Sequence, residues 1–199
     1  MLLFDEKIDD LLPFDGTVIY YPGVLTQTVA DDYFDRLSKN IAWKNDESVI
    51  MGRRIITKRM VAWYGDLPFS YAYSGTTKKA LKWTAELSEI RKLAEEITGA
   101  KFNSCLLNLY HNGGEGLGWH SDNESTLVAN ATIASFSLGA EREFWFRHRK
   151  SKQKIAITLT NGSLLAMSGT TQTHWAHSLP KSAKVKKARI NLTFRRMVD

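Results

Sequence analysis

Two segments in the C-terminal half of the chain carry residue types that bind metal ions. His120 and Asp122 are separated by one residue, so in an extended segment their side chains point the same way. Further along, Thr173-His174-Trp175-Ala176-His177-Ser178 offers a third ligand in either His174 or His177. Two histidines and one carboxylate leave coordination positions open, as in non-haem iron oxygenases, but zinc hydrolases use the same ligand types. The triad therefore predicts a metal centre without naming the metal.

A second feature is the strict alternation of Arg189-Ile190-Asn191-Leu192-Thr193-Phe194-Arg195. In a strand, this pattern places the two arginines, the asparagine and the threonine on one face. An edge strand with a solvated polar face is the ordinary meaning of such alternation. The alternative is a pocket wall, on which the guanidinium groups hold carboxylates. The pattern alone leaves both interpretations open.

The elements that must position these residues are mostly short strands. Glycine-containing turns separate predicted strands at 104–110, 132–138, 143–148, 154–159, 163–167, 173–178 and 188–195, which indicates a β-sandwich or barrel. Apolar residues at helical spacing predict helices at 28–39 and 79–98, the second ended by Gly99. Between the helices, residues 48–56 are typical of a hairpin with Met51 and Gly52 at its tip.

The composition indicates one globular domain in a reducing compartment. The chain has 199 residues, 43% of them hydrophobic and 24% charged, which excludes a disordered or fibrous protein. Its single cysteine, Cys105, cannot form an internal disulfide, so we expect an intracellular protein, cytoplasmic or nuclear. The N-terminus does not resemble a signal peptide, and no segment approaches the ~20 apolar residues of a membrane span. We therefore expect no membrane partner, and a monomer.

Basic residues are concentrated beyond residue 50. Residues 1–50 contain 10 acidic and 4 basic residues, whereas residues 51–199 contain 11 acidic and 23 basic ones, so that charges of −6 and +12 give the total of +6. This asymmetry favours a basic body that binds a polyanion, although a solvated basic surface has the same composition. The basic run before the last predicted strand, which contains Lys181, Lys184, Lys186 and Lys187, either follows a phosphate backbone or is an ordinary solvated loop.

From about Met60 to Met197, the chain resembles the AlkB family of iron- and 2-oxoglutarate-dependent oxygenases, most closely its DNA alkylation-repair branch. The motif of residues 189–195 is specific, because its four fixed polar residues rarely recur at that spacing by chance. The shared motifs are Ala62-Trp63-Tyr64-Gly65, Asn108-Leu109-Tyr110, His120-Ser121-Asp122, Ile133-Ala134-Ser135-Phe136-Ser137-Leu138-Gly139-Ala140, Gly162-Ser163-Leu164-Leu165, His174-Trp175-Ala176-His177-Ser178-Leu179-Pro180 and Arg189-Ile190-Asn191-Leu192-Thr193-Phe194-Arg195.

The resemblance implies an α+β fold: a double-stranded β-helix, a jelly-roll-like sandwich, with N-terminal helices packed on one side and a nucleotide-recognition hairpin region. We expect one compact domain with three parts. Residues 1–45 form an N-terminal extension with one helix, residues 46–101 the recognition hairpin and its supporting helix, and residues 102–199 the catalytic core.

The resemblance also implies a cofactor and two cosubstrates. It assigns His120, Asp122 and His177 as catalytic ligands of Fe(II), and it selects His177 over His174. It assigns Asn108, Tyr110, Arg189, Thr193 and Arg195 to 2-oxoglutarate; Asn191 is expected to orient its neighbours at the same site. The implied reaction couples O2-dependent decarboxylation of 2-oxoglutarate to hydroxylation of an N-methyl group, which leaves as formaldehyde. The bases implied are of the 1-methyladenine and 3-methylcytosine type.

A methylated base-pairing edge is reachable only in a flipped or unpaired base. The resemblance places Tyr71 and Tyr73 against that base, although both tyrosines could simply pack on the sandwich. It places Met51, Gly52 and Arg53 in a hairpin that enters duplex DNA, with Met51 where relatives carry an aromatic finger.

The expected substrate contacts also include the two residues that directly follow Asp122, the proposed metal-binding carboxylate. Asn123 stands where the repair enzymes carry an acidic residue, so the preference for cationic bases is open, and Glu124 follows as a compensating carboxylate. The expected partner is DNA, duplex or single-stranded, with RNA as a further candidate. Two other functions remain open: a nucleic-acid-binding module without turnover, and an oxygenase of the same chemistry that acts on a substrate other than nucleic acid.

Overall fold

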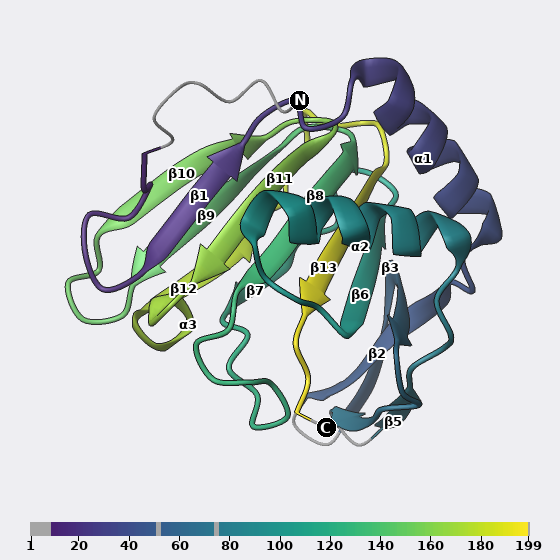
Figure 1. Cartoon of the computed structure of the whole chain (residues 1–199), viewed down its shortest axis with the longest axis horizontal. Coiled ribbons are helices and arrows are strands. Elements are labelled where there is room, and N and C mark those ends of the chain that lie inside the picture. The colour runs from purple at the N-terminus through teal and green to yellow at the C-terminus, as the bar shows by residue number, and fades with distance from the viewer. Residues whose placement is uncertain (1–8, 51–52, 74–75, 199) are drawn as a thin grey trace.

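The computed structural model describes residues 9–50, 53–73 and 76–198, and its framework is two antiparallel sheets that face each other (Figure 1). The larger sheet has the order β1-β11-β8-β13-β6-β3-β2 and the smaller one β10-β9-β12-β7, while β4 and β5 form a separate pair. This arrangement confirms the predicted sandwich. The strands are β1 (Thr17–Tyr21), β2 (Lys44–Ile50), β3 (Arg53–Gly65), β4 (Ser70–Tyr73), β5 (Thr76–Lys79), β6 (Ser104–Tyr110), β7 (Leu117–His120), β8 (Ile133–Gly139), β9 (Arg142–His148), β10 (Lys154–Leu159), β11 (Ser163–Ser168), β12 (Trp175–Leu179) and β13 (Arg189–Arg195).

The alternating strand β13 lies in the middle of the larger sheet, not at its edge. Arg189 is paired with Tyr110 of β6 on one side and with Gly139 of β8 on the other. The interpretation as a solvated edge strand is therefore wrong. The polar residues of β13 face the interior between the sheets, where Arg189 is only 2% exposed.

Two helices, α1 (Gln27–Asn40) and α2 (Ala85–Thr98), cover the outer face of the larger sheet (Figure 1). Leu37 of α1 and Ile90 of α2 are fully buried with Leu192 and Phe194 of β13 in one apolar cluster. Because successive residues of a strand point to opposite sides, β13 supplies this core with one face and the interior with the other. The helices thus hold the strand whose polar face builds the pocket.

Local hydrogen bonds explain where the helices begin and end. The hydroxyl of Thr84 accepts the Leu87 N–H at 3.3 Å as an N-cap, and Gly99 ends α2 in the left-handed conformation with φ 67°. The predicted start of α2 at residue 79 is wrong. Residues up to Lys79 pair with β4 instead, and the Leu81 N–H donates to the Trp63 carbonyl at 2.8 Å.

Near the interior, the chain differs from the sequence-based prediction at β12. The predicted strand 173–178 begins only at Trp175, because Thr171–His174 form the short helix α3. Strands β1 and β7 were not predicted. Strand β7 is short and lies at the end of a glycine-rich stretch that contains Gly113, Gly114, Gly116 and Gly118. Both close the sandwich at sheet edges.

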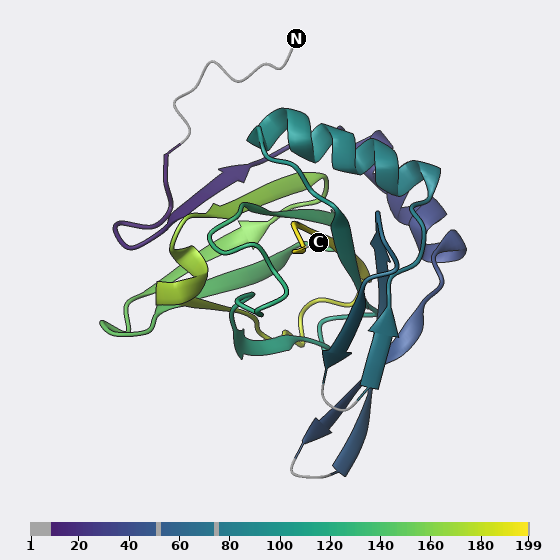
Figure 2. The same cartoon turned by 60° about the horizontal axis from the view of Figure 1, so that its bottom comes forward.

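The predicted hairpin is present, with Ile50 of β2 paired with Arg53 of β3, and Figure 2 shows it projecting from the sandwich. Met51 and Gly52, its predicted tip, lie outside the described residues. Within the part of the chain that the structure describes, no helix is long and apolar enough to cross a membrane.

Candidate active site

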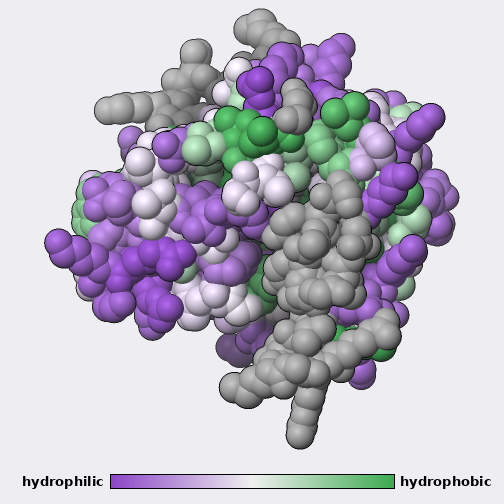
Figure 3. Space-filling view, turned by 90° about the horizontal axis from the view of Figure 1, so that it is seen from below, coloured by the Kyte–Doolittle hydropathy of each residue, from purple (hydrophilic) through white to green (hydrophobic). Residues whose placement is uncertain are grey.

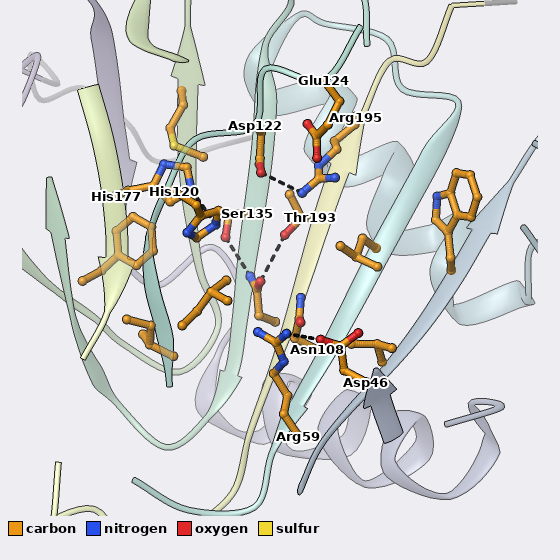
Figure 4. A pocket seen from close by; sticks show the side chains of 18 of the residues that line it. Asp46, Arg59, Asn108, His120, Asp122, Glu124, Ser135, His177, Thr193 and Arg195 are labelled. Atoms are coloured by element: carbon orange, nitrogen blue, oxygen red, sulfur yellow. Dashed lines mark hydrogen bonds and ion pairs between the residues drawn. The ribbon is translucent and has the colours of Figure 1, made fainter. Parts of the chain in front are cut away.

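A pocket of about 200 Å³ lies between the two sheets and is lined by residues of both (Figure 4). The smaller sheet contributes His120 and His177, and the larger sheet contributes the polar face of β13. Residues more than fifty positions apart in the sequence therefore share one enclosed space.

The three predicted metal ligands converge at one side of this pocket. His120 ends β7 and is the register partner of His177 on β12, while Asp122 follows β7. One ligand atom of each residue lies within 4.8 Å of the others, and the two histidine Nε2 atoms are 3.1 Å apart. The structure thus brings His177, and not His174, into this cluster, whereas His174 belongs to a separate group with Asp15 and His148. The His174 ring stacks near His148 instead, with centroids 6.2 Å apart.

The protonation states at the triad suit a divalent cation. The Nδ1 atom of His120 lies 2.8 Å from the Gly118 carbonyl oxygen, to which it can only donate, so that its Nε2 lone pair faces His177. Burial lowers the pKa of His177 to about 3, which leaves that ring neutral at neutral pH. Two imidazole nitrogens and a carboxylate are the donor set of non-haem Fe(II) sites, so these residues fit the ion.

Asp122 is held as a carboxylate by its surroundings. Burial alone would raise its pKa, but Arg195 and the two histidines lower it, and Arg195 Nη2 lies 3.0 Å from the Asp122 Oδ1 atom. The backbone N–H of Asp122 donates to the side-chain Oε1 of Gln172 at 2.9 Å. Gln172 is a positioning residue that no sequence pattern reveals, because it lies on α3, 50 positions away.

The polar residues of β13 form a connected row along the opposite wall (Figure 4). The Thr193 hydroxyl donates to Asn191 Oδ1 at 3.0 Å, and Asn191 Nδ2 donates to the Ser135 hydroxyl at 2.7 Å. Arg189 Nη2 donates to the Ser137 hydroxyl at 2.8 Å. The Asn191 carboxamide thus links Thr193 to Ser135.

Arg189 and Arg195 differ in how their charges are balanced. Burial would lower the pKa of Arg195, but Asp122 and Glu124 raise it, and the ion pair with Asp122 neutralises the charge. Arg189 makes no ion pair with any described residue, and burial lowers its pKa only to about 10, so it stays protonated at neutral pH. A buried cation without a counterion indicates that the pocket binds an anion.

Asn108 and Tyr110 of β6 line the pocket beside β13, with Asn108 opposite Asn191 in register. The guanidinium of Arg59 lies 5.9 Å from the centre of the Tyr110 ring and is ion-paired with Asp46. Asp46 and Arg59 also line the pocket, below Asn108 in Figure 4. The sequence analysis missed this pair. Asp46 lies where the register between β2 and β3 shifts, so strand alternation does not predict that it meets Arg59.

The predicted substrate residues are placed less uniformly. Glu124 lines the pocket, whereas Asn123 is exposed and lines a second pocket behind Asp122. Of Arg53, Tyr71 and Tyr73 only the backbone is described, in β3 and β4.

The basic loop after β12 is exposed and braced. Lys181, Lys184, Lys186 and Lys187 are all exposed. Gly113 joins this loop to the preceding glycine-rich turn, since its N–H donates to the Val185 carbonyl at 2.8 Å and its carbonyl accepts the Ser182 N–H at 2.7 Å. Figure 3 shows that, on the face seen from below, an apolar patch borders strongly hydrophilic surface.

Comparisons with known proteins agree with this geometry. The sequence profile of the 2OG-Fe(II) oxygenase superfamily matches residues 17–195. Over 195 residues the chain is 35% identical to the human DNA oxidative demethylase ALKBH2, which covers 92% of this chain and 75% of that protein. It is 36% identical to the bovine alpha-ketoglutarate-dependent dioxygenase alkB homolog 3 over 87% of this chain and 64% of that protein. The solved structure of OsALKBH1 has the same fold, with a TM-score of 0.64 and 16% identity over 90% of this chain and 97% of that one.

Proposed function

Because the chain belongs to the AlkB family of the 2OG-Fe(II) oxygenase superfamily, we propose that it demethylates N-alkylated bases in DNA by oxidation and so reverses alkylation damage directly. An enzyme of this superfamily uses Fe(II), 2-oxoglutarate and O2. The observation that carries the proposal is that the His120–Asp122–His177 cluster and the uncompensated Arg189 open onto one pocket.

In this proposal, the triad holds Fe(II) and the larger sheet holds 2-oxoglutarate. Bound together, the ion, 2-oxoglutarate and O2 supply the oxidising power that hydroxylates the N-methyl group. A 2-oxo acid chelates a metal through its oxo and adjacent carboxylate oxygens, so its second carboxylate needs a separate cation. Arg189, with Asn108 and Tyr110 beside it, is suited to that carboxylate, whereas Arg195 and Thr193 lie nearer to Asp122 (Figure 4).

The chain itself contributes orientation and exclusion of water. Phe144 stacks on His177 with ring centroids 5.3 Å apart, which shields the ligand ring on one side. Gln172 and Arg195 fix the backbone and the carboxylate of Asp122, respectively. This packing would help to exclude water from the site before the methyl group is in place.

We propose that the target base is read at the outer part of this pocket. Tyr71 and Tyr73 would stack on a flipped base, and Glu124 would accept a hydrogen bond from its exocyclic amine. Asn123 is proposed to contact the strand next to the base, since it lines the neighbouring pocket. A carboxylate and aromatic faces favour cationic lesions such as 1-methyladenine and 3-methylcytosine.

Duplex DNA is the proposed form of the substrate. If Met51 and Gly52 form the tip predicted for this hairpin, with Arg53 beside them, an apolar side chain would enter the base stack and an arginine would contact phosphate. The four exposed lysines 181, 184, 186 and 187 would follow a phosphate backbone. The buried single cysteine supports a location inside the cell, in the cytoplasm or nucleus.

The test is a side-by-side rate measurement on matched oligonucleotides that carry one 1-methyladenine or 3-methylcytosine. Single- and double-stranded DNA and RNA are compared, with loss of the methyl group followed by mass spectrometry. We expect fastest repair of duplex DNA, and a larger loss on duplex than on single strands for Met51→Ala. Binding of the oligonucleotides without turnover would instead support a nucleic-acid-binding module. Oxidation of 2-oxoglutarate at a rate that does not depend on nucleic acid would support a substrate of another class.

A further inference from the structure

Three guanidinium groups surround the ring of Tyr110, and one of them has no role in the site described so far. The guanidinium carbons of Arg189, Arg59 and Arg142 lie 5.7, 5.9 and 5.9 Å from the centre of that ring. Arg59 is ion-paired with Asp46, whereas neither Arg142 nor Arg189 forms an ion pair with any described residue.

Arg142 is as deeply buried as Arg189, since both residues are 2% exposed. It begins β9, and its Nη2 atom donates to the carbonyls of Glu115 at 2.9 Å and Pro180 at 2.7 Å. Its Nη1 atom is buried and has no hydrogen-bond partner among the described residues. Arg142 does not itself line the pocket, but the Tyr110 ring, which does, has its centre 5.9 Å from the Arg142 guanidinium.

Two buried cations beside the same ring repel each other, and removing them from water is costly. Burial lowers the pKa of Arg189 most, and the charge of Arg142 lowers it further. A nearby anion would stabilise such an arrangement. The same end of the pocket is the one suited to the second carboxylate of 2-oxoglutarate.

We propose that Arg142 is a positioning residue for 2-oxoglutarate: its buried charge, behind Tyr110, adds to that of Arg189 and strengthens the binding of the carboxylate that does not chelate the metal. This inference rests on the proposed function. It makes the specificity for a dicarboxylic 2-oxo acid depend on two arginines, only one of which contacts the ligand.

Glu115 allows the opposite change of charge to be made beside Arg142, so that the direction of the effect on 2-oxoglutarate affinity can be tested. Its carboxylate raises the pKa of Arg142, although burial lowers it more, so the two side chains interact electrostatically. Removing the charge of Glu115 would make the field at this end of the pocket more positive. Arg142→Gln and Glu115→Gln should therefore change the affinity for 2-oxoglutarate in opposite directions.

The experiment measures binding by calorimetry on protein loaded with Mn(II) in place of Fe(II), so that no turnover occurs. 2-Oxoglutarate is compared with 2-oxobutyrate, which chelates a metal in the same way but lacks the second carboxylate. We expect Arg142→Gln to weaken 2-oxoglutarate about tenfold and to leave 2-oxobutyrate within about twofold. Arg142→Lys, which keeps the charge, should lose no more than about threefold, and Glu115→Gln should bind 2-oxoglutarate about twofold more tightly.

Arg147→Gln is the matched control, because it removes a charge from the opposite face of β9, where Arg147 lies over Trp119. Equal affinity of the Gln and Lys variants at position 142, or equal weakening of both ligands, would overturn the proposal. If the Arg142→Gln variant does not fold, the Glu115→Gln variant decides: unchanged or weaker binding of 2-oxoglutarate in that variant would contradict the proposal. Failure of the unaltered protein to bind 2-oxoglutarate would instead contradict the proposed function.

Discussion

The Nε2 atoms of His120 and His177 lie 3.1 Å apart, although the two residues are 57 positions apart in the sequence. The Gly118 carbonyl holds the proton of His120 on its other ring nitrogen, and burial keeps His177 neutral. Two nitrogen atoms thus face each other beside the Asp122 carboxylate. A divalent cation resolves this arrangement better than a hydrogen bond, because it uses all three groups at once.

Replacing His177 with alanine should abolish metal binding and turnover together. Loss of one of three protein ligands is expected to reduce metal affinity at least about a hundredfold, which metal analysis after gel filtration detects. His174→Ala is the matched control, because that ring lies outside the cluster, in a separate group with Asp15 and His148. Metal retained by the His177 variant but lost by the His174 variant would reverse the assignment.

Replacing Arg189 with alanine should separate cosubstrate binding from metal binding. Because it removes a fully buried cation proposed to pair with a carboxylate, we expect the KM for 2-oxoglutarate to rise on the order of a hundredfold. Metal content should stay close to that of the unaltered protein, since Arg189 lies away from the triad. An unchanged KM, or metal loss in this variant, would show that the role is misassigned.

Substitutions at two neighbouring residues of β13 should differ in whether they mainly affect stability or ligand binding. Leu192 is fully buried against the helices, so Leu192→Ala is expected to lower the free energy of unfolding by about 2–5 kcal/mol. Thr193 faces the pocket, so Thr193→Val should cost about 1 kcal/mol of stability, the hydrogen bond to Asn191, but should weaken 2-oxoglutarate binding. Chemical denaturation together with a 2-oxoglutarate titration distinguishes the two variants. Similar losses of stability would argue against the assignment of Leu192 to the helix-facing side of β13 and Thr193 to its pocket side.

The thiol of Cys105 should be unreactive in the folded protein. It is fully buried on the helix-facing side of β6, and burial raises its pKa well above the usual value, so little thiolate exists at pH 8. Alkylation by iodoacetamide, followed by mass spectrometry, should occur readily only in denaturant. Rapid labelling under native conditions would mean that the packing of α1 and α2 on the sheet is looser than described.

Much of this fold was predictable, because the alternation of polar and apolar residues in β13 and its neighbouring strands, and the turn residues between them, can be recognised within short segments of sequence. Strands β6 and β10 begin and end where alternation and turn residues predicted, and α1 differs by one residue at each end. Strand β7 was missed because its four residues lie after a glycine-rich stretch and pair only through β12. The start of α2 was misplaced because β4 and Trp63 compete for the same backbone groups.

The clustering of the predicted metal ligands could be foreseen from the sequence, whereas the residues that support them could not. His120 and Asp122 are close in sequence, whereas the choice between His174 and His177 depends on where α3 ends and β12 begins. Gln172, Arg142 and the Asp46–Arg59 pair act across strands whose neighbours only the folded sheet defines. Ion pairs and backbone contacts of this kind leave no periodic signal, so sequence patterns cannot reveal them.

The central claim is that one pocket couples oxidation of 2-oxoglutarate to removal of an N-methyl group. Its most direct test is to reconstitute the protein with Fe(II) and 2-oxoglutarate without oxygen, add oxygen and 1-methyladenine DNA, and quantify succinate and formaldehyde in the same sample. The account predicts equal amounts of the two products, with little of either when the DNA is unmethylated. Absence of both products, or succinate formed at the same rate without methylated DNA and without formaldehyde, would contradict it.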